Sequence, residues 1–230
     1  MPVFQLSEQI IFPHPDLAEP DGLLAVGGDL SVRRLITAYR HGIFPWYSDR
    51  DPILWWFTSP RLVLFPEELK VSKRLQRYYR NSGITMSIDR CFDEVIEQCR
   101  NTRKKRHEDT WITDEMLNAY RELHRHGYAH SVECWQQDVL VGGLYGIALG
   151  RVFFGESMFS LVANSSKLAL IYLVKFLISH GFQLIDCQMT TDLLVSMGAR
   201  EISGSRFQGL LKKYIHPNSD DGVWPHEKSG

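Results

Sequence analysis

The stretch AHSVECWQQDVLVGGLYGIALGRVFFGESMFS, residues 129–160, decides the fold class of this chain. It divides into three apolar runs of strand length, and a tight turn at Gly150–Arg151 joins the last two, as in an antiparallel hairpin. The run that follows, 164–181, is apolar on most sides and predicts a buried helix. LIDCQ (184–188) then predicts one more strand. A sheet that carries helices in this order predicts an α/β (α+β) domain.

The first 60 residues differ from the rest in composition. They are rich in Pro, Gly and aromatic residues, which predicts a small domain without one long regular element, packed through Trp46, Trp55 and Trp56. Strand and helix patterns alternate after that point. The sequence therefore predicts a small N-terminal domain at 1–62 and a larger domain at 63–230.

Composition and cysteine use indicate a soluble protein of the cytoplasm. The chain has 230 residues, 44% hydrophobic and 23% charged, and its N-terminus shows no secretory signal. The longest apolar run, LALIYLVKFLI, is broken by Lys175 and is too short to span a bilayer. The four cysteines form no CxxC pair, and the nine histidines have no metal-ligand spacing. We therefore expect free thiols, no metal site and no membrane association.

Positive charge is concentrated in one part of a chain whose net charge is only −1. Residues 61–106 hold 12 Lys/Arg against 6 Asp/Glu, and a helix predicted at 67–83 places Lys73, Arg77 and Arg80 in a single stripe. RNTRKKR (100–106) adds charge in what is predicted to be a flexible loop. With the aromatic residues Trp46 and Trp111, this pattern fits single-stranded nucleic acid, because bases stack on rings and cations follow phosphates. The alternative is a solvated charged face and two core tryptophans.

Asp186 and Gln188 fall on one face of the strand predicted at 184–188, and Ile185 and Cys187 fall on the other, because side chains alternate along a strand. A carboxylate beside an amide can orient an amine nucleophile. The alternative is that Asp186 caps a helix or pairs with an arginine, since a buried carboxylate needs a partner. Cys187 has no neighbouring base and is predicted to be a packing residue.

Glu156 lies in a run that is otherwise aromatic, sulfur-containing or small. Gly155 is compatible with a β-bulge, so the pattern leaves the direction of the Glu156 side chain open. A buried carboxylate beside an apolar pocket suits a cationic substrate, and the alternative is an internal salt bridge.

Nine segments together resemble the bacterial leucyl/phenylalanyl-tRNA–protein transferase family. They occur in order between about residues 12 and 199: DGLLAVGGDLS, AYRHGIFPWYS, DPILWW, TWIT, AHSVECW, VGGLYG, FFGESMFS, SSKLAL and LIDCQ. The combination of FPWYS, GESMFS and DCQ is far more specific than any one of these motifs.

The resemblance implies a fold, an activity and partners. The fold would be a small N-terminal domain plus a C-terminal domain of the GNAT-like (acetyltransferase-like) type. The activity would be transfer of Leu or Phe, and less well Met, from aminoacyl-tRNA to proteins that begin with Arg or Lys, which marks them for N-degron (N-end rule) degradation. No cofactor is expected, because LVANSSKLAL lacks the Gly-rich turn that binds coenzyme A in acetyltransferases. A cytoplasmic monomer is expected.

The resemblance also assigns roles to residues. Gln188 would contact the attacking amine, Asp186 would orient it and stabilise developing positive charge, and Glu156 would pair with the cationic acceptor. The implied aminoacyl pocket is Leu144, Phe153, Met158, Ser160, Leu173, Leu177 and Ile185, and the implied tRNA-binding set is Trp46, Trp111, Lys73, Arg77 and Arg80. Where family members commonly carry a His, this chain has Leu193, so no His is predicted to act as a base there.

Two other classes of function remain open from the sequence. A peptidoglycan-type aminoacyl-tRNA transferase shares the GNAT-like fold but is usually longer, with duplicated domains. A non-catalytic RNA-binding module would need the basic stripe and the tryptophans but neither the acids nor the amide.

Overall fold

The computed structural model of this chain describes residues 3–105, 112–215 and 224. In chain order the elements are β1 (Phe4–Leu6), η1 (Pro15–Leu17), β2 (Leu23–Gly27), α1 (Val32–Arg40), β3 (Phe44–Pro45), β4 (Leu54–Trp56), β5 (Arg61–Leu64), η2 (Pro66–Glu68), α2 (Lys73–Asn81), β6 (Thr85–Ile88), α3 (Phe92–Lys105), α4 (Asp114–Arg125), β7 (Ala129–Gln136), β8 (Val139–Leu149), β9 (Val152–Ser160), α5 (Ser165–Ser179), β10 (Leu184–Gln188), α6 (Asp192–Ser196), β11 (Arg200–Ile202) and α7 (Gly204–Tyr214).

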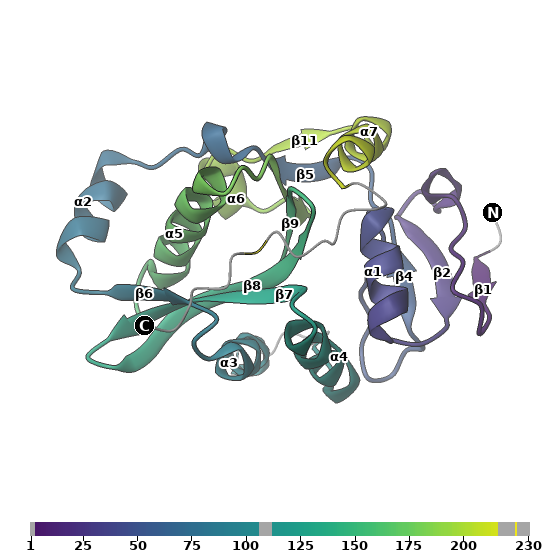
Figure 1. Cartoon of the computed structure of the whole chain (residues 1–230), viewed down its shortest axis with the longest axis horizontal. Helices are drawn as coiled ribbons and strands as arrows, with labels where there is room; N and C mark the ends of the chain where they lie inside the picture. Colours follow the sequence, from purple (N-terminus) through teal and green to yellow (C-terminus); the bar gives the residue numbers. More distant parts are fainter. Residues whose placement is uncertain (1–2, 106–111, 216–223, 225–230) are drawn as a thin grey trace.

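The N-terminal part forms a small sheet with the strand order β1-β2-β4-β3, at one end of the molecule (Figure 1). Trp55 is its central packing residue. The Trp55 side chain is completely buried, its indole N–H donates to the carbonyl of Gly27 at 2.8 Å, and Phe12 packs edge-on against the ring. Trp46 is 39% exposed, but its ring packs edge-on against Trp56, with ring centres 5.6 Å apart, and its carbonyl accepts from the Trp56 indole N–H.

A seven-stranded sheet with the order β11-β5-β10-β9-β8-β7-β6 makes up most of the chain. The strands predicted between 129 and 160 are β7, β8 and β9, the predicted turn at Gly150–Arg151 is present, and LIDCQ is β10. Among the described strands of this sheet, β9 and β10 form the parallel pair and the other neighbours run antiparallel. The predicted α/β (α+β) class, with a small N-terminal domain before a larger C-terminal one, is confirmed. Arg61 and Leu62 lie in this large sheet, although the predicted domain boundary follows residue 62.

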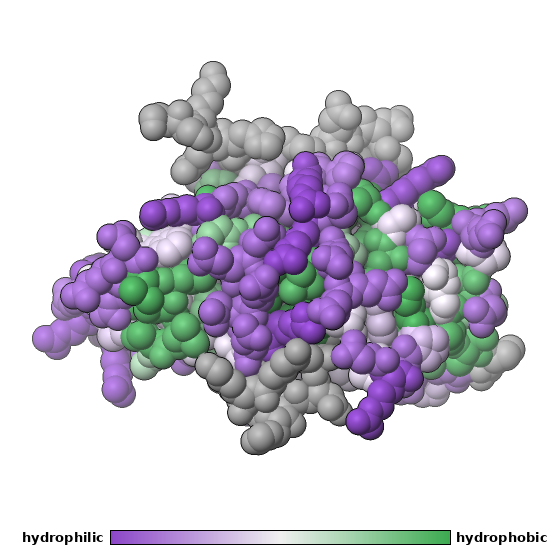
Figure 2. Space-filling model, turned by 90° about the horizontal axis from the view of Figure 1, so that it is seen from below, coloured by the Kyte–Doolittle hydropathy of each residue, from purple (hydrophilic) through white to green (hydrophobic). Residues whose placement is uncertain are grey.

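Helices cover both faces of the large sheet (Figure 1). Helix α5 packs on one face through an apolar cluster, and α3 and α4 pack on the other face through a second cluster that continues into the N-terminal domain. The side of the molecule seen from below is largely hydrophilic, with its hydrophobic residues in separate patches (Figure 2). The core therefore consists of two layers divided by one sheet.

Helix boundaries differ from the sequence prediction in two places. Helix α2 begins only at Lys73, where the Ser72 hydroxyl accepts a hydrogen bond from a first-turn amide. Helix α3 continues to Lys105, so the prediction of a flexible loop at 100–106 is wrong up to that residue. Arg and Lys are good helix formers, and no Gly or Pro interrupts this stretch. Arg106 lies outside the described residues.

Two predictions from composition can be compared with the described part of the chain. All four cysteines are free thiols. Within residues 3–105 and 112–215, no helix has the length and apolar character needed to cross a bilayer.

Gly142 is required where α5 docks on β8. A Cβ at this position would lie 2.2 Å from the hydroxyl oxygen of Ser165, and that hydroxyl already donates to the carbonyl of Val141. We expect Gly142→Ala to lower the free energy of unfolding in urea by about 1–3 kcal/mol, because the start of α5 must move. The control is Gly209→Ala in α7, where a Cβ meets nothing within 4 Å, and which should be neutral or slightly stabilising. Equal effects of the two substitutions would contradict this explanation.

Candidate functional site

The candidate site lies where the parallel pair β9–β10 ends. The last paired residues are Phe154 and Asp186, and each strand has a bulge just beyond that point. Glu156 is the extra residue on β9 and Cys187 is the extra residue on β10. Gln188 follows with a positive φ of 59°, a conformation that is uncommon for a residue with a side chain.

The two bulges bring polar side chains from different strands together. The Gln188 amide nitrogen Nε2 donates to Glu156 Oε1 at 3.0 Å, although the residues are 32 positions apart in the sequence. Both residues are only partly buried and keep some exposure to solvent. The sheet therefore presents an acid and an amide, in contact, at an accessible edge.

Asp186 is engaged differently. Its carboxylate accepts hydrogen bonds from both Nε and Nη2 of Arg61, at 2.8 and 2.6 Å, and both side chains are completely buried. The backbone N–H of Gln188 donates to the same carboxylate at 3.0 Å. The structure thus shows the alternative that the sequence left open, in which Asp186 pairs with an arginine, and it links that pair directly to the backbone of Gln188.

Arg61 also ties the strand end to the N-terminal part of the chain. Its Nη2 donates to the carbonyl of Gly42 at 3.0 Å, and Nη1 donates to the hydroxyl of Thr58 at 3.3 Å. Its guanidinium lies 4.8 Å from the ring centre of Phe44 and 4.7 Å from that of Phe207. A planar cation that packs against two rings and donates through four of its five N–H groups is a rigid support for Asp186.

Glu156 is surrounded by hydrogen-bond donors. The hydroxyls of Tyr39 from α1 and Tyr120 from α4 donate to its two oxygens, each at 2.8 Å, and Gln188 is the third donor. Burial nevertheless raises the pKa of Glu156 to about 7, because the cost of desolvating the charge exceeds the stabilisation by these donors. Burial also raises the pKa of Tyr39 and Tyr120 well above the usual value, so both phenols are neutral at physiological pH.

The residues just described form one polar cluster, which consists of Glu156, Gln188, Asp186, Arg61, Tyr39 and Tyr120. Ile185 and Cys187 face away from this polar cluster. Both pack against the apolar cluster below α5, as the predicted alternation requires. Burial, reinforced by the nearby charge of Asp186, raises the pKa of the Cys187 thiol. A thiol held in its protonated form is a poor nucleophile, which supports the prediction that Cys187 is a packing residue.

The seven residues predicted for an aminoacyl pocket occupy one region between α5 and the sheet. The five buried ones and Met158 belong to a single apolar cluster, in which Ile185 on β10 is directly paired with Phe153 on β9. Ser160 is at the edge of this region, and its hydroxyl donates to Ser166 and accepts from the Ser166 N–H. The indole of Trp224 packs beside Phe153, with ring centres 5.9 Å apart.

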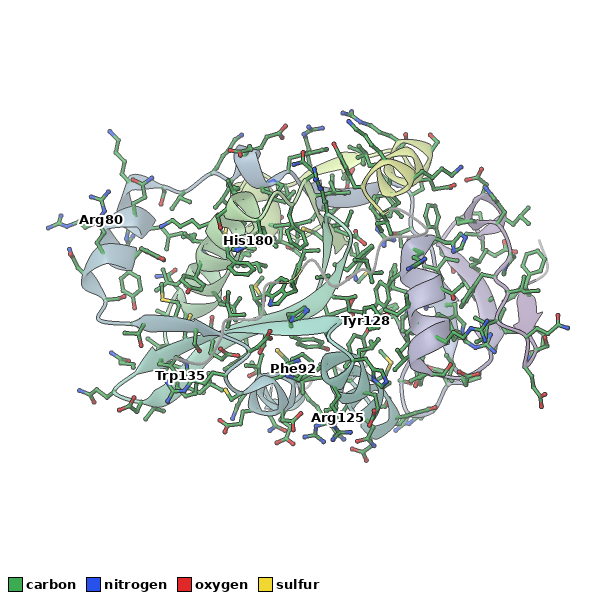
Figure 3. The ribbon with its side chains drawn as sticks, viewed as in Figure 1. Arg80, Phe92, Arg125, Tyr128, Trp135 and His180 are labelled. Carbon is green, nitrogen blue, oxygen red and sulfur yellow. The ribbon has the colours of Figure 1, made fainter. Side chains whose placement is uncertain are left out.

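The residues predicted to bind tRNA are spread over the molecule. Lys73, Arg77 and Arg80 are exposed on α2, and Arg80 points outward from that end of the molecule (Figure 3). Trp46 is exposed in the N-terminal domain at the opposite end, in edge contact with Trp56. Trp111 lies outside the described residues.

Sequence reasoning missed three residues of the polar cluster, namely Tyr39, Tyr120 and Arg61. Each comes from a segment more than 30 positions away from its partner carboxylate, and local patterns contain no information on such pairings. The only signal was the need of a buried Asp186 for a cationic partner.

One group of metal-ligand types comes together among the described residues. Ligand atoms of Asp89, His124 and His130 lie within 4.8 Å of one another. Both ring nitrogens of His130 are already within hydrogen-bond distance of Asp89 and the Gly127 carbonyl, and His124 Nδ1 is bonded to the carbonyl of Ala129. Internal hydrogen bonds therefore account for this cluster, which lies outside the polar cluster at the strand ends.

Comparison with known proteins gives consistent matches over nearly the whole chain. Residues 63–212 match the family model described as leucyl/phenylalanyl-tRNA protein transferase, and residues 28–59 match the model of the N-terminal domain of the same family. The chain is 57% identical to the leucyl/phenylalanyl-tRNA–protein transferase of Desulfotalea psychrophila, over 97% of this chain and 99% of that protein. It is 59% identical to the protein of the same name from Syntrophobacter fumaroxidans, over 94% of this chain and 92% of that protein.

Solved structures give weaker matches. FemX has a TM-score of 0.46 with 12% identity, covering 78% of this chain and 70% of that one. A GCN5-related N-acetyltransferase from Kribbella flavida has a TM-score of 0.38 with 12% identity, covering 73% of this chain and 60% of that one. Both TM-scores are below 0.5, and the family assignment therefore rests on the sequence matches.

The buried ion pair predicts a large asymmetry between single and double substitutions. Arg61→Met leaves the Asp186 charge buried without its partner, and we expect it to lower the free energy of unfolding by about 3–5 kcal/mol. Arg61→Met combined with Asp186→Leu removes both charges and should recover most of that loss. Urea denaturation of the three proteins measures both effects. A single substitution that costs less than about 1 kcal/mol would show that the pair is not desolvated.

The pKa of Glu156 predicts how stability changes with pH. Because folding raises this pKa from the ordinary value to about 7, the folded state holds a proton that the unfolded state has lost between these values. The contribution of Glu156 to stability therefore falls as pH rises from about 4.5 through 7. We expect Glu156→Gln, measured by urea denaturation, to become more stable relative to the unsubstituted protein from pH 5 to pH 8. A constant difference between the two proteins over this range would contradict the raised pKa.

Proposed function

Because this chain belongs to the leucyl/phenylalanyl-tRNA–protein transferase family, we propose that it moves an aminoacyl group from aminoacyl-tRNA to the N-terminus of an acceptor protein. The chain is a transferase. The observation that carries the specific proposal is the contact between Gln188 and Glu156 at a partly exposed strand end. The buried Arg61–Asp186 pair supports this contact through a hydrogen bond to the backbone of Gln188.

The reaction depends mainly on how the amine and the ester carbonyl are positioned relative to one another. The aminoacyl ester of a charged tRNA is already activated, and a peptide α-amine has a pKa of roughly 7.7–8.0, so a sizeable neutral fraction exists at pH 7. Holding the amine against the ester carbonyl in a fixed geometry can then supply most of the rate enhancement.

In this proposal Gln188 contacts the attacking amine, and Asp186 acts as a positioning residue. Asp186 has no exposed surface, so its contribution reaches the amine through the Gln188 backbone, which it holds in the unusual conformation at positive φ. Glu156 supplies the negative charge that attracts a cationic acceptor. No step in this scheme requires a metal ion or coenzyme A.

The apolar region between α5 and the sheet would receive the aminoacyl side chain. Leu144 of β8 and Leu173 of α5 are among its buried residues. Apolar pockets separate side chains that differ by one methylene by only about 1–3 kcal/mol. Acceptance of both Leu and Phe, with Met as a weaker substrate, fits such a site.

The exposed cations of α2 would contact the tRNA acceptor stem, and Trp46, with Trp111, would stack on the 3′-terminal nucleoside. Helix α2 and the N-terminal sheet lie at opposite ends of the molecule (Figure 1). An elongated nucleic acid can reach both, whereas a small molecule cannot.

We further propose that the acceptors begin with Arg or Lys and that the product enters N-degron (N-end rule) degradation. A cationic N-terminal residue complements the carboxylate of Glu156. The proposed setting is the cytoplasm, with the protein acting as a monomer.

The activity can be tested with radiolabelled Leu-tRNA and two peptides that differ only in the first residue. We expect label to enter the peptide that begins with Arg and not the one that begins with Asp, because Glu156 repels a second carboxylate. The label bound to each peptide is counted after the peptide has been separated from the tRNA. Absence of label from the peptide that begins with Arg, or equal labelling of the two peptides, would refute the proposal.

Substitutions should separate transfer from tRNA binding. Asp186→Ala leaves Arg61 buried without its partner and lowers stability, and the protein that remains folded is expected to lose transfer while retaining affinity for aminoacyl-tRNA. Lys73→Ala with Arg77→Ala should weaken that affinity and lower the slope of log affinity against log salt by about 1–2, because fewer phosphates are neutralised. Filter binding at several salt concentrations measures both variants. If the folded Asp186→Ala protein also lost tRNA binding, the role of Asp186 would not be limited to positioning Gln188.

A further inference from the structure

Besides Arg61, the polar cluster holds four titratable groups, and they differ in whether a substrate can reach them. Tyr39 and Tyr120 are neutral phenols, and Asp186 is enclosed by Arg61 and has no exposed surface. Glu156 is the group that combines partial exposure with direct contact to Gln188.

Glu156 retains an open acceptor position. A carboxylate has about four lone-pair positions on its two oxygens. Among the described residues, Oε1 accepts from Tyr39 and Gln188, and Oε2 accepts from Tyr120. One position on Oε2 is therefore left for a donor from a bound molecule.

The hydrogen bonds around Glu156 also show where a proton fits. The hydroxyl oxygens of Tyr39 and Tyr120 are within hydrogen-bond distance of each other as well as of Glu156, which makes three contacts among three groups. Two phenols supply only two protons for these three contacts. A third proton on Glu156 gives each contact one hydrogen, so the cluster is built to accept a proton at this carboxylate.

We propose that Glu156 is a catalytic residue that accepts a proton from the α-ammonium group of the acceptor at the open position of Oε2, while Tyr39 and Tyr120 remain hydrogen-bonded to the same carboxyl group. This inference rests on the proposed function, since it needs an amine as the acceptor and an aminoacyl ester as the donor. It goes beyond attraction of a cation, because the carboxylate changes its protonation state during the reaction.

The step balances as follows in atoms and charge. Glu156 takes one proton from the α-ammonium group, and the lone pair left on nitrogen forms the new C–N bond with the ester carbonyl carbon. The ester C–O bond breaks, its electron pair stays on the ribose oxygen, and that oxygen takes a second proton from the nitrogen. Glu156 then releases its proton to solvent, and one N–H remains in the peptide bond.

The groups that face Glu156 hold its pKa close to that of a peptide α-amine, so that proton transfer from the α-ammonium group to Glu156 has a small free-energy change. Tyr39 from α1 and Tyr120 from α4 donate to it, Tyr145 of β8 packs against Tyr120, and Asp186 of β10 adds a negative charge that Arg61 offsets. The pKa of about 7 at Glu156 lies about one unit below that of a peptide α-amine. A base whose pKa lies near the working pH is efficient in general acid–base catalysis.

The test compares single-turnover transfer at saturating acceptor for two nucleophiles, using the full-length protein and Leu-tRNA. One acceptor peptide begins with arginine, and the other begins with its α-hydrazino analogue, which is neutral at pH 7 and needs no deprotonation before attack. We expect Glu156→Gln to slow transfer to the arginine peptide by about 100-fold or more at saturation and to affect the hydrazino peptide much less. The matched control is Glu133→Gln, the same substitution at a buried carboxylate of β7 outside the polar cluster, which should leave both rates near those of the unsubstituted protein.

Other outcomes would overturn the inference. An unchanged rate at saturation with only a higher KM for the arginine peptide would show that Glu156 merely binds a cation. Equal losses for both nucleophiles would show that it merely positions them. If the unsubstituted protein transferred leucine to neither peptide, the proposed function itself would fail, which is a separate result.

A second variant keeps the inference testable if Glu156→Gln does not fold. Tyr120→Phe removes one donor that stabilises the carboxylate, so it should move the inflection near pH 7 in the rate–pH profile to higher pH. An inflection that stays in place would overturn the inference.

Discussion

The buried ion pair between Arg61 and Asp186 is the constraint on which the rest of the site depends. Two opposite charges removed completely from water are stable only when each finds nearly all of its partners, and here both do. The partners come from the N-terminal segment, from β5 and from β10. The pair therefore fixes the small domain against the strand that carries Gln188.

The geometry of the sheet explains why polar groups meet at this place. The parallel strands β9 and β10 are joined through α5, and their ladder stops at Phe154 and Asp186. A bulge on each strand then turns Glu156 and Gln188 toward one another instead of continuing the ladder. An acid and an amide can thus lie in contact at a partly exposed edge while apolar residues of the same strands fill the layer below α5.

The two carboxylates of the polar cluster, the partly exposed Glu156 and the completely buried Asp186, can play different chemical roles. Asp186 is fixed by Arg61 and has no surface, so it can hold Gln188 but cannot reach a substrate. Glu156 is partly exposed, and burial rather than a charge partner sets its pKa. The same sheet edge therefore provides a rigid support and a group that can exchange a proton.

The sequence predicted the sheet well because its strands carry strong local signals. The hairpin around Gly150 and the alternation in LIDCQ are properties of neighbouring residues, and both are present in the structure. The extent of α3 was missed because high charge at 100–105 does not prevent a helix when no breaker is present. The partners of Glu156 and Asp186 could not be predicted, because Tyr39, Tyr120 and Arg61 reach them only through the tertiary fold.

The most direct test is an experimental structure with two bound ligands, a non-hydrolysable aminoacyl-adenosine and a peptide that begins with arginine. The account predicts the peptide α-nitrogen within roughly 2.6–3.2 Å of both the Gln188 side chain and Glu156 Oε2, with the Arg61–Asp186 pair unchanged. An α-nitrogen bound to Asp186, with Arg61 displaced, would contradict it.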